Sequence, residues 1–229
     1  LQARLSAFGT VKGSLSSLQS TVNQLKSSSS FQSVDANSDD TDIFTAVASS
    51  NASAGKYQIK VDTLAQAHSL SSSGFIDAKS VIGTGTLTFS FGTLNGGSFT
   101  TNADKPTKGV VIDSSNNSLE GIRDAVNAAN IGVTAAVINT GSADGIPYKL
   151  VFTSDDTGAA NSLKVTVAEE GGSPTNIDTS GLSQIAYDPE AGVGSGQNLS
   201  EINIAQDADI AINGLQVFRA SNTITDVIE

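Results

Sequence analysis

The side chains able to carry catalysis are few, because the 229-residue chain has one histidine, His68, and no cysteine. A single imidazole excludes sites that need two, and the lack of cysteine excludes thiolate nucleophiles, disulfides and cysteine-bound zinc. His68 follows the segment Leu64-Ala-Gln-Ala and precedes a serine-rich run. Because no nucleophile or orienting acid stands near it in the sequence, we expect no catalytic role for His68.

One acidic segment has part of the spacing of a calcium loop. Asp35, Asn37 and Asp39 match the first three oxygen ligands, but the glycine of that loop is replaced by Asp40 and its terminal acid by Ala46. We therefore interpret this segment as a solvated linker and expect no metal site.

Two pairs of neighbouring acids, Asp155-Asp156 and Glu169-Glu170, are the remaining candidates for acid–base chemistry. Glycoside hydrolysis needs two carboxyl groups several ångströms apart across a sugar cleft, which adjacent residues do not provide. A cleft built from acids distant in sequence stays open, so a secreted polysaccharide hydrolase is kept as a remote alternative.

Two glycine patterns are weak matches to nucleotide sites. Gly192, Gly194 and Gly196 begin a dinucleotide fingerprint, but its third glycine falls on Gln197 and no parallel-sheet pattern surrounds it. The Gly55-Lys56 pair lacks the upstream glycine and the Ser or Thr of a phosphate loop. We expect no cofactor.

The charge balance also excludes several classes of partner. Lys plus Arg number 12 against 23 Asp plus Glu, a formal net charge of -11, and such a surface repels phosphate backbones and anionic lipids. No apolar run approaches the roughly 20 residues that span a bilayer. We therefore expect no nucleic-acid partner and no membrane insertion. The chain opens at Leu1 without a cationic, hydrophobic leader, so we expect it to be an excised fragment.

The elements that must position these side chains begin with an N-terminal helix. Apolar residues recur every seven positions from Leu1, with a second series between them, which is the spacing of an amphipathic or coiled-coil helix. We expect its partner to be a helix beyond Glu229 or one from another subunit; the alternative is packing on its own domain. The predicted helix-packing seam consists of Phe8, Val11, Leu15, Leu18, Val22 and Leu25.

A polar stretch from Lys26 to Asp40 predicts a linker, so residues 1–40 form a leg helix and linker. Beyond it, alternation of apolar residues over 44–48 and 57–61 predicts a β-hairpin across the turn at 49–55.

The remaining pattern predicts an α+β, mainly β fold. Alternation predicts strands near 87–91, 110–112, 133–137, 148–152 and 163–167. Ser118 is a candidate N-cap for one amphipathic helix over 118–130. Asn213-Gly214 predicts a type I′ hairpin that pairs Ile212 with Leu215 and Ile210 with Val217, and Thr223 predicts the start of another helix.

Several segments together resemble the family of bacterial flagellar filament cap proteins. Residues 55–67 (GKYQIKVDTLAQA) are similar to that family's G-x-Y-x-I-x-V-x-x-L-A-x-A stretch, and residues 118–130 (SLEGIRDAVNAAN) to its central region. Residues 205–208 (AQDA) and 221–228 (SNTITDVI) resemble the passage before its C-terminal leg, with Ala220 in place of a usual serine. The matches cover most of residues 43–229, in order.

The resemblance implies a structural protein without enzymatic activity. It implies two β-rich head domains, one inserted in the other, after the N-terminal leg helix: residues 41–75 with 198–229 form the outer domain, and 76–197 the insert. It further implies a homo-oligomeric ring at the extracellular filament tip that holds flagellin while it folds and polymerises, serving motility and adhesion.

The implied partners are copies of itself, flagellin and, before secretion, a flagellar export chaperone. The alternative within the binding class is another flagellar axial protein or a surface adhesin, because similar central segments occur in other flagellar axial proteins.

Overall fold

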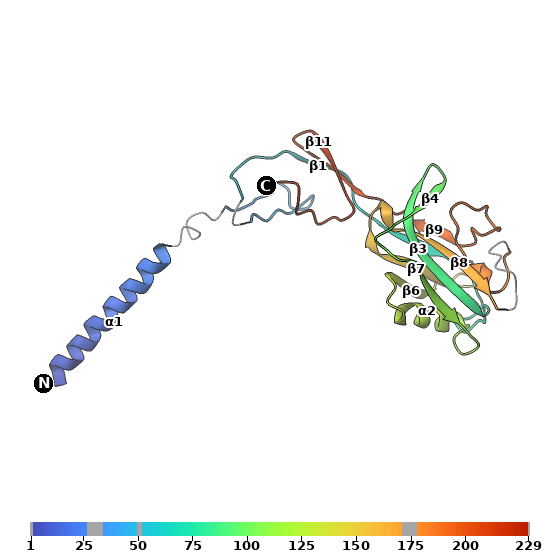
Figure 1. The fold of residues 1–229 in the computed structure, drawn as a ribbon, viewed down its shortest axis with the longest axis horizontal. Coiled ribbons are helices and arrows are strands. Elements are labelled where there is room, and N and C mark those ends of the chain that lie inside the picture. The colour runs from blue at the N-terminus through green and yellow to red at the C-terminus, as the bar shows by residue number, and fades with distance from the viewer. Residues whose placement is uncertain (1, 27–33, 50–51, 171–177, 229) are drawn as a thin grey trace. The chain divides into compact units, whose positions relative to one another are not determined.

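A computed structural model describes residues 2–26, 34–49, 52–170 and 178–228 of the chain. They divide between two compact units, residues 1–57 with 225–229 and residues 58–224. The elements, drawn in Figure 1, are in chain order α1 (Gln2–Leu25), β1 (Ile59–Thr63), β2 (Ala67–Ser71), β3 (Gly85–Asn95), β4 (Ser98–Thr101), β5 (Lys108–Ile112), α2 (Leu119–Ala128), β6 (Val133–Asn139), β7 (Tyr148–Thr157), η2 (Ala159–Asn161), β8 (Ser162–Glu169), η3 (Gly181–Ile185), β9 (Ser200–Asn203), β10 (Ala208–Ile212) and β11 (Leu215–Arg219).

The first unit consists of α1 and irregular chain. The helix confirms the predicted N-terminal element and runs for 24 residues. The segment 34–49 contains no strand. Of the linker predicted from Lys26 to Asp40, residues 27–33 lie outside the described residues.

A three-stranded sheet in the order β1-β10-β11 opens the second unit. Its β10–β11 hairpin has the predicted register, with Ile212 opposite Leu215 and Ile210 opposite Val217. Asn213 and Gly214 form the turn with φ of 52° and 83°, the left-handed values that a type I′ turn requires.

The predicted hairpin over residues 44–61 is wrong. The segment 44–48 forms no strand, and β1 instead pairs antiparallel with β10, which places Ile59 opposite Ile212 and Val61 opposite Ile210. Two isoleucines offer β1 more apolar area than the alanines at 46 and 48, and alanine is a poor strand former.

Two four-stranded sheets complete the second unit. One has the order β6-β7-β2-β9. In the other, β3 pairs with β8 along one edge, while β5 and β4 share its opposite edge. All named pairings are antiparallel, so the structure confirms a mainly β, α+β fold with the N-terminal helix.

The core of this unit joins both four-stranded sheets. Buried side chains of β3, β5 and β8 form one cluster with those of β2, β6 and β7. Phe89 of β3 and Phe152 of β7 meet edge to face, with ring centroids 5.3 Å apart. This contact therefore ties one sheet to the other.

Helix α2 lies beside β6 (Figure 1) and buries Leu119, Ile122 and Val126. The hydroxyl of Ser118 accepts a hydrogen bond from the Gly121 amide, which confirms the predicted N-cap. The chain leaves the helix through Asn130 and Gly132, both with positive φ.

Replacing Ser118 with alanine is expected to lower the free energy of unfolding by about 1 kcal/mol, because an amide at the helix start loses its acceptor. Urea denaturation measures the loss. Ser114→Ala is the control, since Ser114 is an exposed residue of the preceding turn and caps no helix; equal losses for the two variants would contradict the capping role.

The helix predicted to start at Thr223 is absent from the described residues up to Ile228. The preceding residue has another role, because the Asn222 side chain accepts from the Ala65 amide at 2.7 Å and donates to the Ala65 carbonyl at 3.0 Å. The segment is thus anchored to the chain after β1, and a stretch this short gains little from helix formation alone.

The division into an outer domain and an insert stays a prediction. Strand pairing adds a constraint to it: β2 and β9, both within the ranges assigned to the outer domain, pair with each other, and β2 also pairs with β7 of the insert. The four-stranded sheet of β2 thus contains strands from both ranges.

Candidate functional site

The apolar stripe along α1 is the first candidate, as an interaction surface. Phe8, Val11, Leu15 and Leu18 are 59–75% exposed, and Val22 is 42% exposed; the side chain of Leu25 lies outside those described. Residues three and four apart share one helix face, so these five side chains form a continuous apolar seam. Such a stripe is typical of a surface that another helix covers.

The second candidate is a buried polar cluster around His68 of β2. The imidazole is 2% exposed. Its Nδ1 lies 2.8 Å from the backbone nitrogen of Leu163, and its Nε2 lies 3.0 Å from Oε1 of Glu201. Because Nδ1 must accept the Leu163 N–H, the neutral ring carries its proton on Nε2 and donates it to Glu201.

Tyr187 completes the cluster. Its ring meets that of His68 edge to face with 5.7 Å between centroids. Burial, together with a hydrogen bond to Glu201, raises the pKa of the Tyr187 phenol. Burial lowers the pKa of His68, and the hydrogen bond and charge of Glu201 offset this only in part.

The sequence alone does not identify these partners. Glu201 lies 133 residues from His68, and only the pairing of β2 with β9 brings them together. Tyr187 reaches the cluster through a bridge to Val165 of β8. No short-range spacing marks either residue, so the acid next to His68 that the sequence appeared to lack comes from tertiary structure.

A small cavity of about 80 Å³ adjoins the cluster and includes His68, Tyr187 and Glu201 in its lining. Pockets for small organic ligands have roughly 300–1,000 Å³. This cavity is therefore too small for a sugar unit, and the cluster is more suited to joining strands than to holding a substrate.

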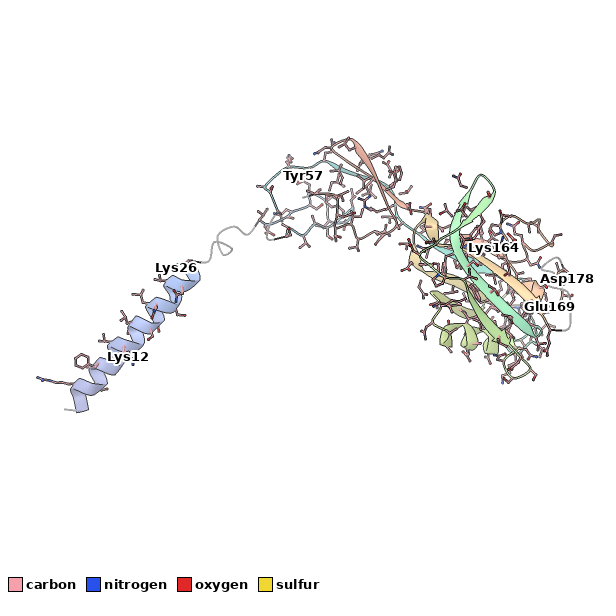
Figure 2. All side chains as sticks on the ribbon, viewed as in Figure 1. Lys12, Lys26, Tyr57, Lys164, Glu169 and Asp178 are labelled. Atoms are coloured by element: carbon pink, nitrogen blue, oxygen red, sulfur yellow. The ribbon has the colours of Figure 1, made fainter. Side chains whose placement is uncertain are left out.

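Three of the four acids considered for glycoside chemistry have structural partners. Asp155 accepts from Thr134 at 2.6 Å, and Asp156 pairs with Lys105 at 2.6 Å. Glu169, at the end of β8 (Figure 2), accepts from the backbone amide of Ser183 in η3 at 2.8 Å. These contacts fix strands and turns.

The other considered patterns lie in irregular chain. Asp35, Asn37 and Asp39 are exposed in the segment 34–49. Among the described residues, no three or more His, Asp or Glu side chains gather as metal ligands would. Gly192, Gly194 and Gly196 belong to the loop before β9, and Lys56 is exposed ahead of β1.

None of the helices in the described parts of the chain is long and apolar enough to cross a membrane.

Comparison with known proteins gives a consistent result. The family model described as flagellar hook-associated protein 2 N-terminus matches residues 1–68. B-type flagellar hook-associated protein 2 of Pseudomonas aeruginosa is 34% identical over 231 residues, covering 99% of this chain and 45% of the relative. Flagellar hook-associated protein 2 of Escherichia coli K12 is 35% identical over 226 residues, covering 98% of this chain and 43% of the relative.

Solved structures agree with these relatives. The D1-D2-D3 domains of the Escherichia coli flagellar cap protein FliD superpose with a TM-score of 0.74 at 33% identity, covering 98% of this chain and 57% of that one. Its D2-D3 domains alone give 0.65 at 33% identity, covering 80% and 82%. The chain thus spans less than half the length of the curated relatives it matches.

Proposed function

Because this chain belongs to the flagellar hook-associated protein 2 family of flagellar cap proteins, we propose that it is part of a ring at the filament tip. In this role it retains exported flagellin and promotes flagellin folding and polymerisation. The observation that carries the proposal is the exposed seam of α1, whose large apolar side chains are 42–75% exposed where described. A cap protein in this role binds other subunits, and an apolar stripe with this spacing suits packing against a helix of a partner.

The proposed partners are copies of the same protein, flagellin and, before secretion, an export chaperone. The extracellular filament tip is the proposed location. The absence of cysteine suits a protein that is exported unfolded and folds outside the cell. A net charge of -11 limits nonspecific association of the assembled heads.

The proposed arrangement keeps the leg helix and linker at residues 1–40, the outer head domain at 41–75 with 198–229, and the insert at 76–197. The seam residues, Leu25 included, are assigned to the contact with a leg helix of the longer protein or of another subunit. We assign the chain no catalytic activity and no cofactor.

A complementation experiment tests this function. A strain lacking the gene, supplied with the full-length gene, is expected to regain filaments and swimming motility, because retained flagellin can then polymerise. Filament length by electron microscopy and flagellin in the medium are the measurements. Unpolymerised flagellin leaking into the medium despite normal expression of the cap protein would count against the proposal.

Two other functions have distinct outcomes. A surface adhesin would restore attachment to host cells or surfaces while leaving filament assembly unchanged. A polysaccharide hydrolase would lose activity on a glycan when its acids are replaced by alanine. The small cavity does not favour a sugar-binding cleft, and the structural contacts of Asp155, Asp156 and Glu169 do not favour a catalytic acid pair.

A further inference from the structure

His68, the one histidine in the sequence, is buried in the second unit, and its hydrogen bonds join strands of both four-stranded sheets. It belongs to β2, accepts from Leu163 at the start of β8, and donates to Glu201 of β9. The pairing partners of β2 are β7 and β9, whereas β8 belongs to the sheet of β3. The imidazole therefore links the two sheets at the point where β9 forms an edge.

We propose that His68 is an acid-sensitive latch, a hydrogen-bonded link between the two sheets that protonation breaks. As a neutral ring, His68 holds β8 and β9 to β2. When the ring is protonated, the Leu163 amide loses its hydrogen bond and the contact between these strands weakens.

The geometry explains why the two protonation states differ. In the neutral ring, Nδ1 has a lone pair directed at the Leu163 N–H, 2.8 Å away. In the imidazolium both nitrogens carry hydrogen, so Nδ1–H would face another N–H. The Leu163 amide would then lose its acceptor in a site where Leu163 is itself fully buried, and an unpaired buried amide is costly.

The charged groups around His68 do not reverse this preference. Glu201 attracts the imidazolium, but its side chain is 33% exposed, so solvent screens the attraction. Tyr187 meets the imidazole in an edge-to-face contact, and its phenol stays neutral because its pKa is raised. Lys164, next to Leu163 on β8, bonds away from the cluster to Asp188 at 2.9 Å and Glu190 at 3.0 Å.

On β7, which lies beside β2, the acids are engaged elsewhere: Asp155 with Thr134 and Asp156 with Lys105. The remaining lining of the cavity next to His68 is uncharged, consisting of Leu94, Ala159, Ser162, Pro189, Ile204 and Ala205 together with Leu163.

The sign of the pH effect follows from the lowered pKa of His68. An imidazole in an unfolded chain has a pKa of about 6.5. Between that value and the lower folded value, the unfolded chain binds more protons, so acidification favours unfolding. The contribution of neutral His68 to folding stability is fully present above about pH 6.5 and is lost as the pH falls towards the folded pKa. Because one proton is involved, the folding equilibrium constant falls by at most about tenfold per pH unit.

Nuclear magnetic resonance of the 229-residue chain tests the latch directly, because His68 is its one histidine. We expect the nitrogen spectrum near pH 7.5 to show a proton on Nε2 and none on Nδ1, and the ring to titrate with a midpoint below 6.5. The Leu163 amide shift should move with the same midpoint. A midpoint at or above 6.5, or a proton on Nδ1, would overturn the proposal.

Two variants separate the latch from ordinary acid denaturation by the many carboxylates. Glu201→Gln keeps an oxygen acceptor for Nε2–H but removes the charge, so the His68 midpoint should fall further; Glu190→Gln, a carboxylate outside the cluster, should leave it unchanged. Urea unfolding between pH 5 and 8 should show a steeper loss for the native chain than for His68→Gln. An unchanged midpoint in Glu201→Gln contradicts the proposal even if His68→Gln does not fold.

Discussion

Replacing Phe152 with alanine is expected to lower the free energy of unfolding by about 3–5 kcal/mol, one of the largest single losses available in this fold. Phe152 is fully buried on β7, and its ring stands nearly perpendicular to that of Phe89, at 83°. The change leaves a cavity between the two four-stranded sheets, removes apolar burial and breaks the aromatic contact that joins them. Urea denaturation of the 229-residue chain measures the loss.

The matched control is Phe218→Ala on β11. Phe218 is 56% exposed and pairs with Asp209 across the three-stranded sheet, so little area returns to water and no cavity forms. Its expected cost is below about 1 kcal/mol. Losses of similar size for the two phenylalanines would show that the contact between the sheets is not where the stability of this unit is concentrated.

Local chemistry made some elements predictable. The β10–β11 register follows from the turn alone, because Asn213 and Gly214 accept positive φ and thereby fix which residues face each other. The start of α2 follows from Ser118, whose hydroxyl caps the helix as its position predicts. In both cases the decisive interactions lie within a few residues.

Long-range pairing was not predictable in the same way. The alternation over 44–48 is typical of a strand, but β1 pairs with β10 and not with this segment. Likewise, β2 is a short polar strand whose serines Ser69 and Ser71 are buried, a composition that no hydrophobic pattern marks as central. Its place between β7 and β9 depends on the whole sheet.

The same distinction applies to the two candidate sites. The α1 seam is visible in the sequence, because its heptad spacing is a property of one helix. The His68 cluster is not, because Glu201 and Tyr187 lie far from His68 in the sequence and strand pairing brings them to it on separate segments. A search of the sequence for a local acid next to His68 therefore has nothing to find.

In the full-length protein, Leu15→Asp combined with Leu18→Asp is expected to abolish rescue of motility in a strain lacking the gene. Both leucines are exposed on α1, at 65% and 59%, and the partner helix proposed above would bury them. Losing two such side chains removes about 1.5–3 kcal/mol each, which weakens helix association about a hundredfold or more. Motility on soft agar and flagellin released into the medium are the measurements.

Ser17→Asp with Ser20→Asp is the control, because it adds the same charge to the helix face opposite the seam and should leave motility intact. Unfolding of the 229-residue chain should be nearly unchanged in both double variants, since each alters only exposed positions of α1. A loss of function without a loss of stability would then place the effect at the contact with another helix. Full motility of the leucine variant would instead mean that the seam is not a packing surface, because two carboxylates cannot be buried there without severe cost.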